Sequence, residues 1–171
     1  DPARARDGDG RDSNPADEGD WTAAGECSAT STARNSSWHG THVAGTVGAV
    51  TNNALGVAGV AFNARIQPVR VMGKCGGLIS DIVDGIVWAS GGTVVGIPAN
   101  ATPAKVINMS LGGSGTCDVA YQTAIDAAVG RGTVVVVAAG NNAKDEGIAS
   151  TESMIVVSAT NSSDARASFS S

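Results

Sequence analysis

The segment VINMSLGGSGTCDVAYQTAIDAAVGRGTVVVVAA, residues 106–139, decides the fold class. Its two ends, 106–111 and 133–139, are almost continuously apolar, which is typical of strands that are covered on both faces of a parallel sheet. Between them, 118–129 has the apolar spacing of an amphipathic helix. A strand, a helix and a second strand in this order predict a βαβ unit. The residues expected on the core face of the helix are Tyr121, Ile125, Ala128 and Val129.

The same alternation continues on both sides of this unit. We expect a strand at 65–72 and a helix at 80–90, which Ser80 can cap, and a further strand at 154–159. Another helix is expected at 39–50, where apolar residues recur at helical spacing. The sequence therefore predicts an α/β fold with three layers, αβα, around a mainly parallel sheet.

Composition excludes several classes of protein. Of the 171 residues, 42% are hydrophobic and 16% are charged, which is the balance of a folded domain rather than a disordered chain. No apolar run reaches the ~20 residues of a membrane span, so we expect neither a span nor a signal peptide and no membrane partner. The net charge is -5, and the acidic residues gather in the first twenty positions. Without a basic face, we expect no nucleic-acid partner.

Candidate functional residues follow the predicted strands, because ligands of open α/β sheets bind beyond the carboxyl ends of strands. Asn141 follows the most apolar strand, where its amide can stabilise a developing oxyanion, although a plain turn residue is the alternative. Residues 110–113 can pair with an extended peptide, or form a simple glycine turn. His39 at a helix start can act as a base. We expect His42 to be packed and not to bind metal, because the glutamate of an HExxH motif is absent.

Four blocks of the sequence occur in a distinctive order. They are HGTHVAGTVGAVTNNALGVAGVA at 39–61, INMSLGG at 107–113, VVVVAAGN at 134–141 and RASFSS at 166–171. Together they resemble the subtilisin-like serine proteases. The acidic stretch DGDGRDSNPADEGDW before the first block, with KCGG at 74–77, looks most like secreted bacterial subtilases that have an extended calcium loop.

The resemblance implies a role for individual residues. His39 would be the general base of a Ser-His-Asp triad, and Asn141 the side-chain donor of the oxyanion hole. One wall of a peptide-binding cleft would be Ser110, Leu111 and Gly112. The pocket for the side chain before the cut would be lined by Ala138, Ala139 and Gly140. Met72 and Ile79 would shape neighbouring subsites.

Two motifs of this family do not occur in the sequence. The family's aspartate lies in an Asp-Ser/Thr-Gly context and its serine in Gly-Thr-Ser-Met-Ala, and Asp1 is not preceded by a strand. We therefore expect residues 1–171 to be the central part of one subtilase catalytic domain, incomplete at both ends. Residues 1–37 would form an acidic calcium loop and linker, and 38–171 the core of sheet and helices.

Two functions are compatible with these residues. One is a secreted serine endopeptidase that cuts polypeptides, with its Asp and Ser outside this segment, in which case the remaining part of the enzyme is a partner if it is a separate chain. The alternative is a non-catalytic module that keeps the peptide groove but lacks the triad. A serine and an aspartate in the full-length chain would exclude the second.

Calcium is the expected cofactor. Asp7, Asp9 and Asp12 offer hard oxygen ligands at short spacing, with the Arg11 carbonyl between them and Asp20 as a further candidate. A solvated acidic loop is the alternative interpretation. The resemblance implies part of a second calcium site, formed by the side chain of Asn53 and the carbonyls of Leu55 and Val57.

The three cysteines, Cys27, Cys75 and Cys117, have neither a CxxC pair nor a zinc spacing. The resemblance implies a Cys27–Cys75 disulfide, with Cys75–Cys117 as the alternative, and the sequence cannot choose between connectivities. Either bond would require an oxidising compartment, as expected for a secreted protein.

Overall fold

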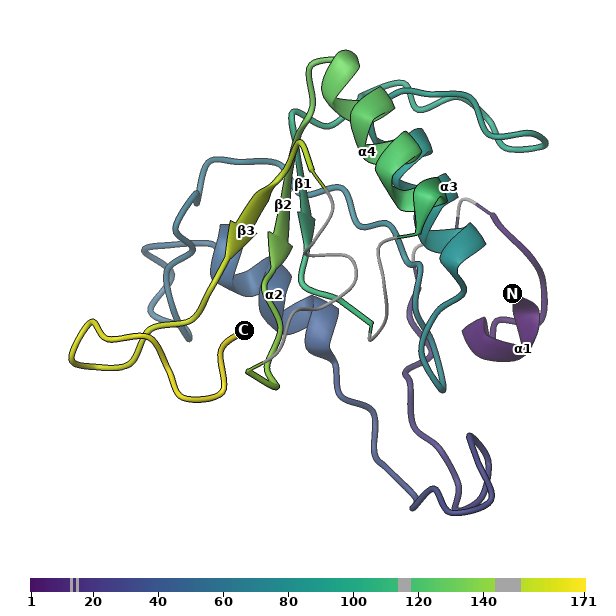
Figure 1. Ribbon diagram of the computed structural model, residues 1–171, viewed down its shortest axis with the longest axis horizontal. Helices are drawn as coiled ribbons and strands as arrows, with labels where there is room; N and C mark the ends of the chain where they lie inside the picture. Colours follow the sequence, from purple (N-terminus) through teal and green to yellow (C-terminus); the bar gives the residue numbers. More distant parts are fainter. Residues whose placement is uncertain (13, 15, 114–117, 144–151) are drawn as a thin grey trace. The chain divides into compact units, whose positions relative to one another are not determined.

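The computed structural model describes residues 1–12, 14, 16–113, 118–143 and 152–171. The chain forms two compact units, Asp1–Asp81 and Ile82–Ser171. Figure 1 labels the helices and strands along the chain. The first contains helices α1, Pro2–Ala5, and α2, His39–Gly48. Helix α3, Ile79–Ala89, begins at the end of the first unit and continues into the second.

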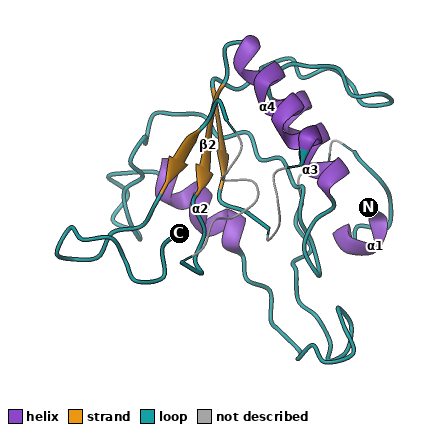
Figure 2. Cartoon of the chain, in the orientation of Figure 1, coloured by secondary structure: helices purple, strands orange, loops and turns teal. Residues whose placement is uncertain are grey.

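The second unit is built on a parallel sheet. Strands β1, Val106–Met109, β2, Val134–Ala138, and β3, Ile155–Val157, lie side by side in the order β1-β2-β3 (Figure 2). Every pair is parallel. Helix α4, Val119–Gly130, connects β1 to β2 and contacts β2. The predicted βαβ unit is therefore confirmed, with strands shorter by one to two residues at their ends than the apolar runs that predicted them.

The core of this unit lies between α4 and the sheet. Ile125 of α4 and Val137 of β2 are fully buried, and Val135 is 1% exposed. Burial at alternate positions of β2 follows from the two-residue period of a strand. Of the expected helix face, Ile125 and Ala128 are buried, but Tyr121 is only half-buried and Val129 is 39% exposed. Val129 is placed in the last turn of α4, where it lines an open cavity.

The strand expected at 65–72 is wrong: among the described residues this segment pairs with no strand. Pro68 lies in its middle and lacks the amide hydrogen that a ladder needs. Its Arg70 instead donates to the Ala5 carbonyl at 2.8 Å, so the segment is held through a side chain. The helix at 80–90 is confirmed but begins at Ile79, which places Ser80 inside the first turn rather than at the cap.

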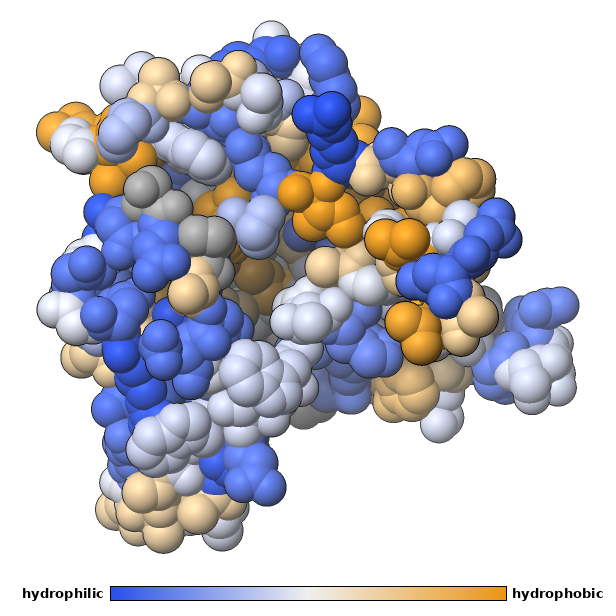
Figure 3. All heavy atoms as spheres, turned by 180° about the vertical axis from the view of Figure 1, so that it is seen from behind, coloured by the Kyte–Doolittle hydropathy of each residue, from blue (hydrophilic) through white to orange (hydrophobic). Residues whose placement is uncertain are grey.

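The first unit is held together mainly by covalent and polar contacts. The hydrophobic residues that are fully buried in the described part of the chain all lie at or beyond Ile82. Cys27 and Cys75 form a disulfide, so the pairing implied by the resemblance is confirmed, whereas Cys117 lies outside the described residues. Apolar and polar side chains are interspersed on the molecular face shown in Figure 3. None of the described helices has the length and apolar character needed to cross a bilayer.

Candidate functional site

The carboxyl ends of β1 and β2 bring two groups of predicted site residues to one edge of the sheet. Met109 pairs with Val137 in a parallel register, so residues 110–112 and 138–141 leave the sheet at the same edge. Ser110 and Leu111 are half-buried and Gly112 is exposed. The Ser110 hydroxyl accepts a hydrogen bond from the Asn108 side chain at 3.0 Å. This edge is where an α/β fold binds its ligand.

The strand end before Asn141 is firmly placed. Ala139 is 5% exposed, and its amide donates to the Val157 carbonyl at 2.9 Å, so the β2–β3 ladder extends one residue beyond β2. Ala138 and Gly140 are half-buried, whereas Asn141 is exposed. An exposed amide that follows a buried strand can reach a substrate oxygen while its backbone stays fixed, as an oxyanion donor requires.

A C-terminal segment that the sequence analysis did not recognise as a support holds this loop. The Ser171 amide donates to the Gly140 carbonyl at 3.2 Å, and the Ala143 amide donates to the Phe169 carbonyl at 3.0 Å. Ser170, which is fully buried, accepts from the Ala159 amide at 2.9 Å. The local sequence RASFSS gives no signal for this role, because the burial of Ser170 is visible only in the structure.

His39 is the first residue of α2 and is exposed. The preceding residue, Trp38, has φ 50° and ψ 28°, a left-handed conformation that a bulky residue rarely adopts. Such backbone strain clusters at functional positions and must be maintained by neighbouring contacts. The expected packing of His42 is wrong: the residue is exposed, because it lies in the first turn of α2, residues 39–42, all of which are exposed.

Asp20 maintains the backbone before His39. Its carboxylate accepts hydrogen bonds from the Ser37 amide at 2.6 Å and the Ser37 hydroxyl at 2.8 Å, and that hydroxyl accepts from the His39 amide at 3.3 Å. Burial raises the pKa of Asp20, but the two hydrogen bonds from Ser37, one from its own backbone amide and the charge of Arg70 together leave the pKa below its usual value. Asp20 therefore orders the chain that enters α2, a role the sequence analysis missed when it considered this residue as a calcium ligand.

The acidic loop contains carboxylates that repel one another. A hydrogen bond between the Asp9 and Asp12 carboxyl groups, together with the charges of Asp12 and Asp7, raises the pKa of Asp9. Asp7 also lies 3.7 Å from the Arg70 guanidinium. The described residues hold no group of three or more His, Cys, Asp or Glu side chains arranged for a metal ion. The carboxylate oxygens of this loop are ligands of the kind that calcium prefers. Of these carboxylates, those of Asp9 and Asp12 lie close enough to share a hydrogen bond.

The turn after α2 carries the residues of the second implied calcium site. The Asn53 side-chain oxygen accepts a hydrogen bond from the Leu55 amide at 3.1 Å, which forms a local turn. Leu55 and Val57 are 75% and 69% exposed. The apolar side chains of Leu55 and Val57 therefore face solvent. The carbonyl groups of these two residues, which the second calcium site would use, belong to the same turn.

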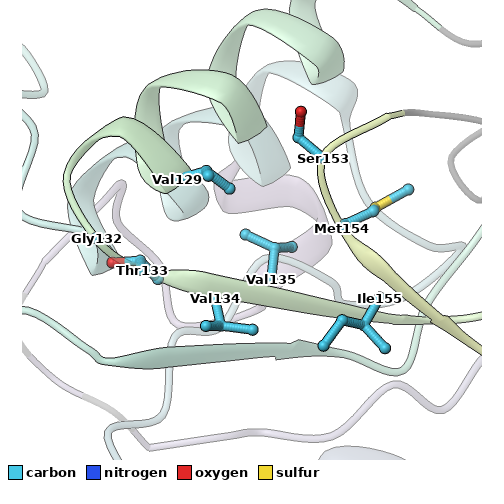
Figure 4. Close-up of a pocket in the computed structure, with 8 residues that line it drawn as sticks. All are labelled: Val129, Gly132, Thr133, Val134, Val135, Ser153, Met154 and Ile155. Atoms are coloured by element: carbon cyan, nitrogen blue, oxygen red, sulfur yellow. The ribbon is translucent and has the colours of Figure 1, made fainter.

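Met72 and Ile79 flank the 73–77 loop in the first unit, and both are exposed, at 41% and 47%. Exposed apolar side chains are common on protein surfaces, so the role of these two residues as subsite walls stays a prediction. Figure 4 shows a separate cavity of about 400 Å³ in the second unit, lined by Val129, Val134 and Ile155 among others. It lies at the amino ends of β2 and β3, opposite the edge that carries Asn141, so it is not the predicted substrate site.

Comparison with known proteins defines the class. The subtilase family model matches residues 9–171, so the chain belongs to the subtilase family. It is 64% identical over 173 aligned residues to an extracellular protease of Xanthomonas campestris pv. campestris, covering 99% of this chain and 30% of that protein. It is 54% identical over 145 residues to an extracellular basic protease of Dichelobacter nodosus, covering 82% of this chain and 24% of that protein.

A solved structure supports the same fold. A protease from Pseudoalteromonas arctica PAMC 21717 superposes with a TM-score of 0.96 at 57% sequence identity, covering 99% of this chain and 51% of that one. The predicted subtilisin-like α/β fold is therefore confirmed. The chain spans about a third or less of the length of the two extracellular relatives and about half of the solved structure.

Proposed function

We propose that this chain supplies the histidine and the oxyanion-hole donor of an extracellular serine endopeptidase. The observation that carries the proposal is the family match over 9–171. Within it, His39 is the first residue of α2, and Asn141 follows the carboxyl end of β2. The Asp and Ser of the triad would come from outside residues 1–171, which form the central part of a single catalytic domain. The relatives named as extracellular proteases and the Cys27–Cys75 disulfide support a secreted enzyme.

His39 would move the proton in both halves of the reaction. It accepts the proton of the serine hydroxyl as the serine oxygen bonds to the substrate carbonyl carbon, and Asn141 donates a hydrogen bond to the oxygen that becomes negative. The carbon–nitrogen bond then breaks, and His39 gives its proton to the leaving amine. Water then attacks the acyl carbon and loses its proton to His39. As the bond from that carbon to the serine oxygen breaks, His39 returns the proton to the serine oxygen and the acid product leaves.

The substrate would be an extended polypeptide. Its backbone would pair with Ser110, Leu111 and Gly112 as an added strand, because these residues leave β1 at the sheet edge. The small side chains of Ala138, Ala139 and Gly140 leave room for the side chain before the cut. Met72 and Ile79 would contact residues further along the peptide.

Calcium would stabilise the acidic segment. We place it at Asp7, Asp9 and Asp12 with the Arg11 carbonyl, because a divalent cation would relieve the repulsion that raises the pKa of Asp9. Chelation should lower the melting temperature of the complete protein, and Asp9→Asn with Asp12→Asn should reduce that sensitivity, because the variant removes only the site in the acidic segment. An unchanged melting temperature after chelation would contradict the calcium proposal. The second site, at Asn53, Leu55 and Val57, would need ligands from outside this chain.

The catalytic proposal is tested on the complete protein with a serine-directed fluorophosphonate probe and a peptide substrate. His39→Ala should remove nearly all peptide hydrolysis without unfolding the protein, because triad residues act as a unit and loss of the histidine lowers kcat by about 10⁶-fold. His42→Ala is the matched control, since it removes an exposed histidine from the same helix and should leave hydrolysis unchanged. No labelling of the wild-type protein, or full activity in His39→Ala, would contradict the proposal and favour a peptide-binding module.

A further inference from the structure

We propose that Glu26 is a positioning residue that holds the 73–77 loop in place for substrate binding. Through this loop it would set the affinity for the peptide residues that contact Met72 and Ile79. The inference rests on the proposed function, because it takes those two residues as subsite walls. It concerns a contact cluster that lies wholly within the first unit.

Glu26 accepts four hydrogen bonds from three residues. Its Oε1 lies 2.7 Å from the Lys74 ammonium and 3.1 Å from Arg6 Nη2, and its Oε2 lies 3.2 Å from Arg6 Nη2 and 2.8 Å from the Ala23 amide. Lys74 belongs to the loop, while Arg6 and Ala23 belong to the N-terminal segment. One carboxylate therefore joins the loop to two separate points of that segment.

The Arg6 end of this bridge is itself fixed. Arg6 follows α1 in a left-handed conformation, with φ 67°, and its guanidinium lies over the Trp21 ring at 3.6 Å from the centroid. Its side chain is 14% exposed, so the cation is partly removed from water and depends on Glu26 for its charge partner. With a neutral residue at position 26, the cations of Arg6 and Lys74 would face each other without the carboxylate between them.

Two backbone groups of the loop bond to the N-terminal segment. The Lys74 amide donates to the Arg4 carbonyl at 3.0 Å, and the Arg4 guanidinium donates to the Cys75 carbonyl at 2.8 Å. The Cys27–Cys75 disulfide adds a covalent link next to Glu26. Gly73 has no room for a side chain, since an added Cβ would collide with the Arg4 carbonyl. The position of the loop is therefore set by the segment that Glu26 joins it to.

A side-chain bridge matters here because the first unit lacks a buried apolar core of its own among the described residues. The disulfide fixes Cys75, but Met72 and Ile79 lie on the two sides of it and are half-exposed. The backbone hydrogen bonds of Lys74 and Cys75 to Arg4 hold the main chain of the loop beside the disulfide. The bond from the Lys74 ammonium to Glu26 adds a side-chain attachment on the Met72 side. This further attachment restricts movement of the loop and so preorganises its surface for a peptide.

The test compares two substrates of the complete enzyme: a tetrapeptide anilide, long enough to contact the loop, and a single-residue ester, which is not. Glu26→Gln should raise KM for the tetrapeptide about two- to fivefold, the change expected for loss of one or two surface ion pairs. Its kcat, and both constants for the ester, should stay unchanged. Lys74→Met should give the same shift, and the double variant should be no worse than either single variant. Asp126→Asn removes a carboxylate on α4 that accepts from Gln122, and serves as the control.

Two results would overturn the inference: an unchanged KM for the tetrapeptide, or an equal loss for both substrates, which would indicate a general effect on folding. If Glu26→Gln does not fold, Lys74→Met alone decides between these results. If the wild-type protein hydrolyses neither substrate, the proposed function fails. Binding of a fluorescein-labelled tetrapeptide, followed by anisotropy, then takes the place of KM, and equal affinity in wild type and variants overturns the inference.

Discussion

Val137→Ala should destabilise the protein much more than Val95→Ala. Val137 is fully buried in β2 between Met109 of β1 and Val156 of β3, whereas Val95 is 96% exposed. The substitution removes the equivalent of two methylene groups at about 0.8 kcal/mol each, and the cavity left in a tightly packed core raises the total to about 2–3 kcal/mol. The same change at Val95 should stay within about 0.5 kcal/mol.

The measurement is urea unfolding of the complete protein in a His39→Ala background, which prevents self-digestion. Tryptophan fluorescence reports on the second unit through Trp88, whose indole donates to the Pro98 carbonyl at 2.8 Å. The two valine variants differ from each other only in the position of an identical deletion. Equal urea midpoints for the two variants would refute the reasoning that β2 forms the centre of the core.

Three further outcomes are expected. The Lys74 hydrogen bond, with the Ala23 amide and the nearby cations, lowers the pKa of Glu26 from 4.5 to about 2. The contribution of Glu26 to the stability of the fold is therefore complete above pH 4.5 and is lost as the pH falls toward 2. Glu26→Gln should flatten the dependence of the melting temperature on pH over that range, and parallel curves for wild type and variant would contradict this. Asp118→Ala should cost about 0.5–2 kcal/mol by urea unfolding, because Asp118 caps α4 through the Ala120 amide; Asp118→Asn, which keeps the acceptor oxygen, should cost less. Gly73→Ala should lower the melting temperature, whereas Gly25→Asn, at an exposed left-handed turn with open space, should change it little.

Local patterns predicted the second unit well, because its fold depends on periodicity. The apolar runs around 106–109 and 134–138 form the predicted parallel strands, and the helix between them crosses over. The expected cover on both faces is not found in the described residues, because only alternate residues of β2 and one residue of β1 are buried. The strand at 65–72 failed for the opposite reason. Its composition is apolar enough for a strand, but Pro68 lacks the amide hydrogen that would donate to a neighbouring strand. Strand pairing also needs a second strand beside the segment, and the composition of the segment alone says nothing of that.

The supports of the candidate site were harder to predict. Glu26 contacts Lys74 across 48 positions, and nothing in the local sequence of either indicates the other. The same holds for the Gly140 carbonyl and the Ser171 amide. Motifs could identify His39 and Asn141, since each lies in a characteristic local sequence. Long-range charge pairs have no such signature, because charged residues occur all over protein surfaces.

The parallel order β1-β2-β3 has a consequence for how this region folds. Val106 can pair with Val134 only after the intervening chain, which includes α4, has folded back over the strands. Val136 can pair with Ile155 only after the connection between β2 and β3 has done the same. Every pairing thus needs closure of a long stretch of chain before any ladder bond compensates for the lost entropy. During synthesis, β1 and β2 must wait as unpaired apolar strands, and this interval is when the protein is most exposed to aggregation.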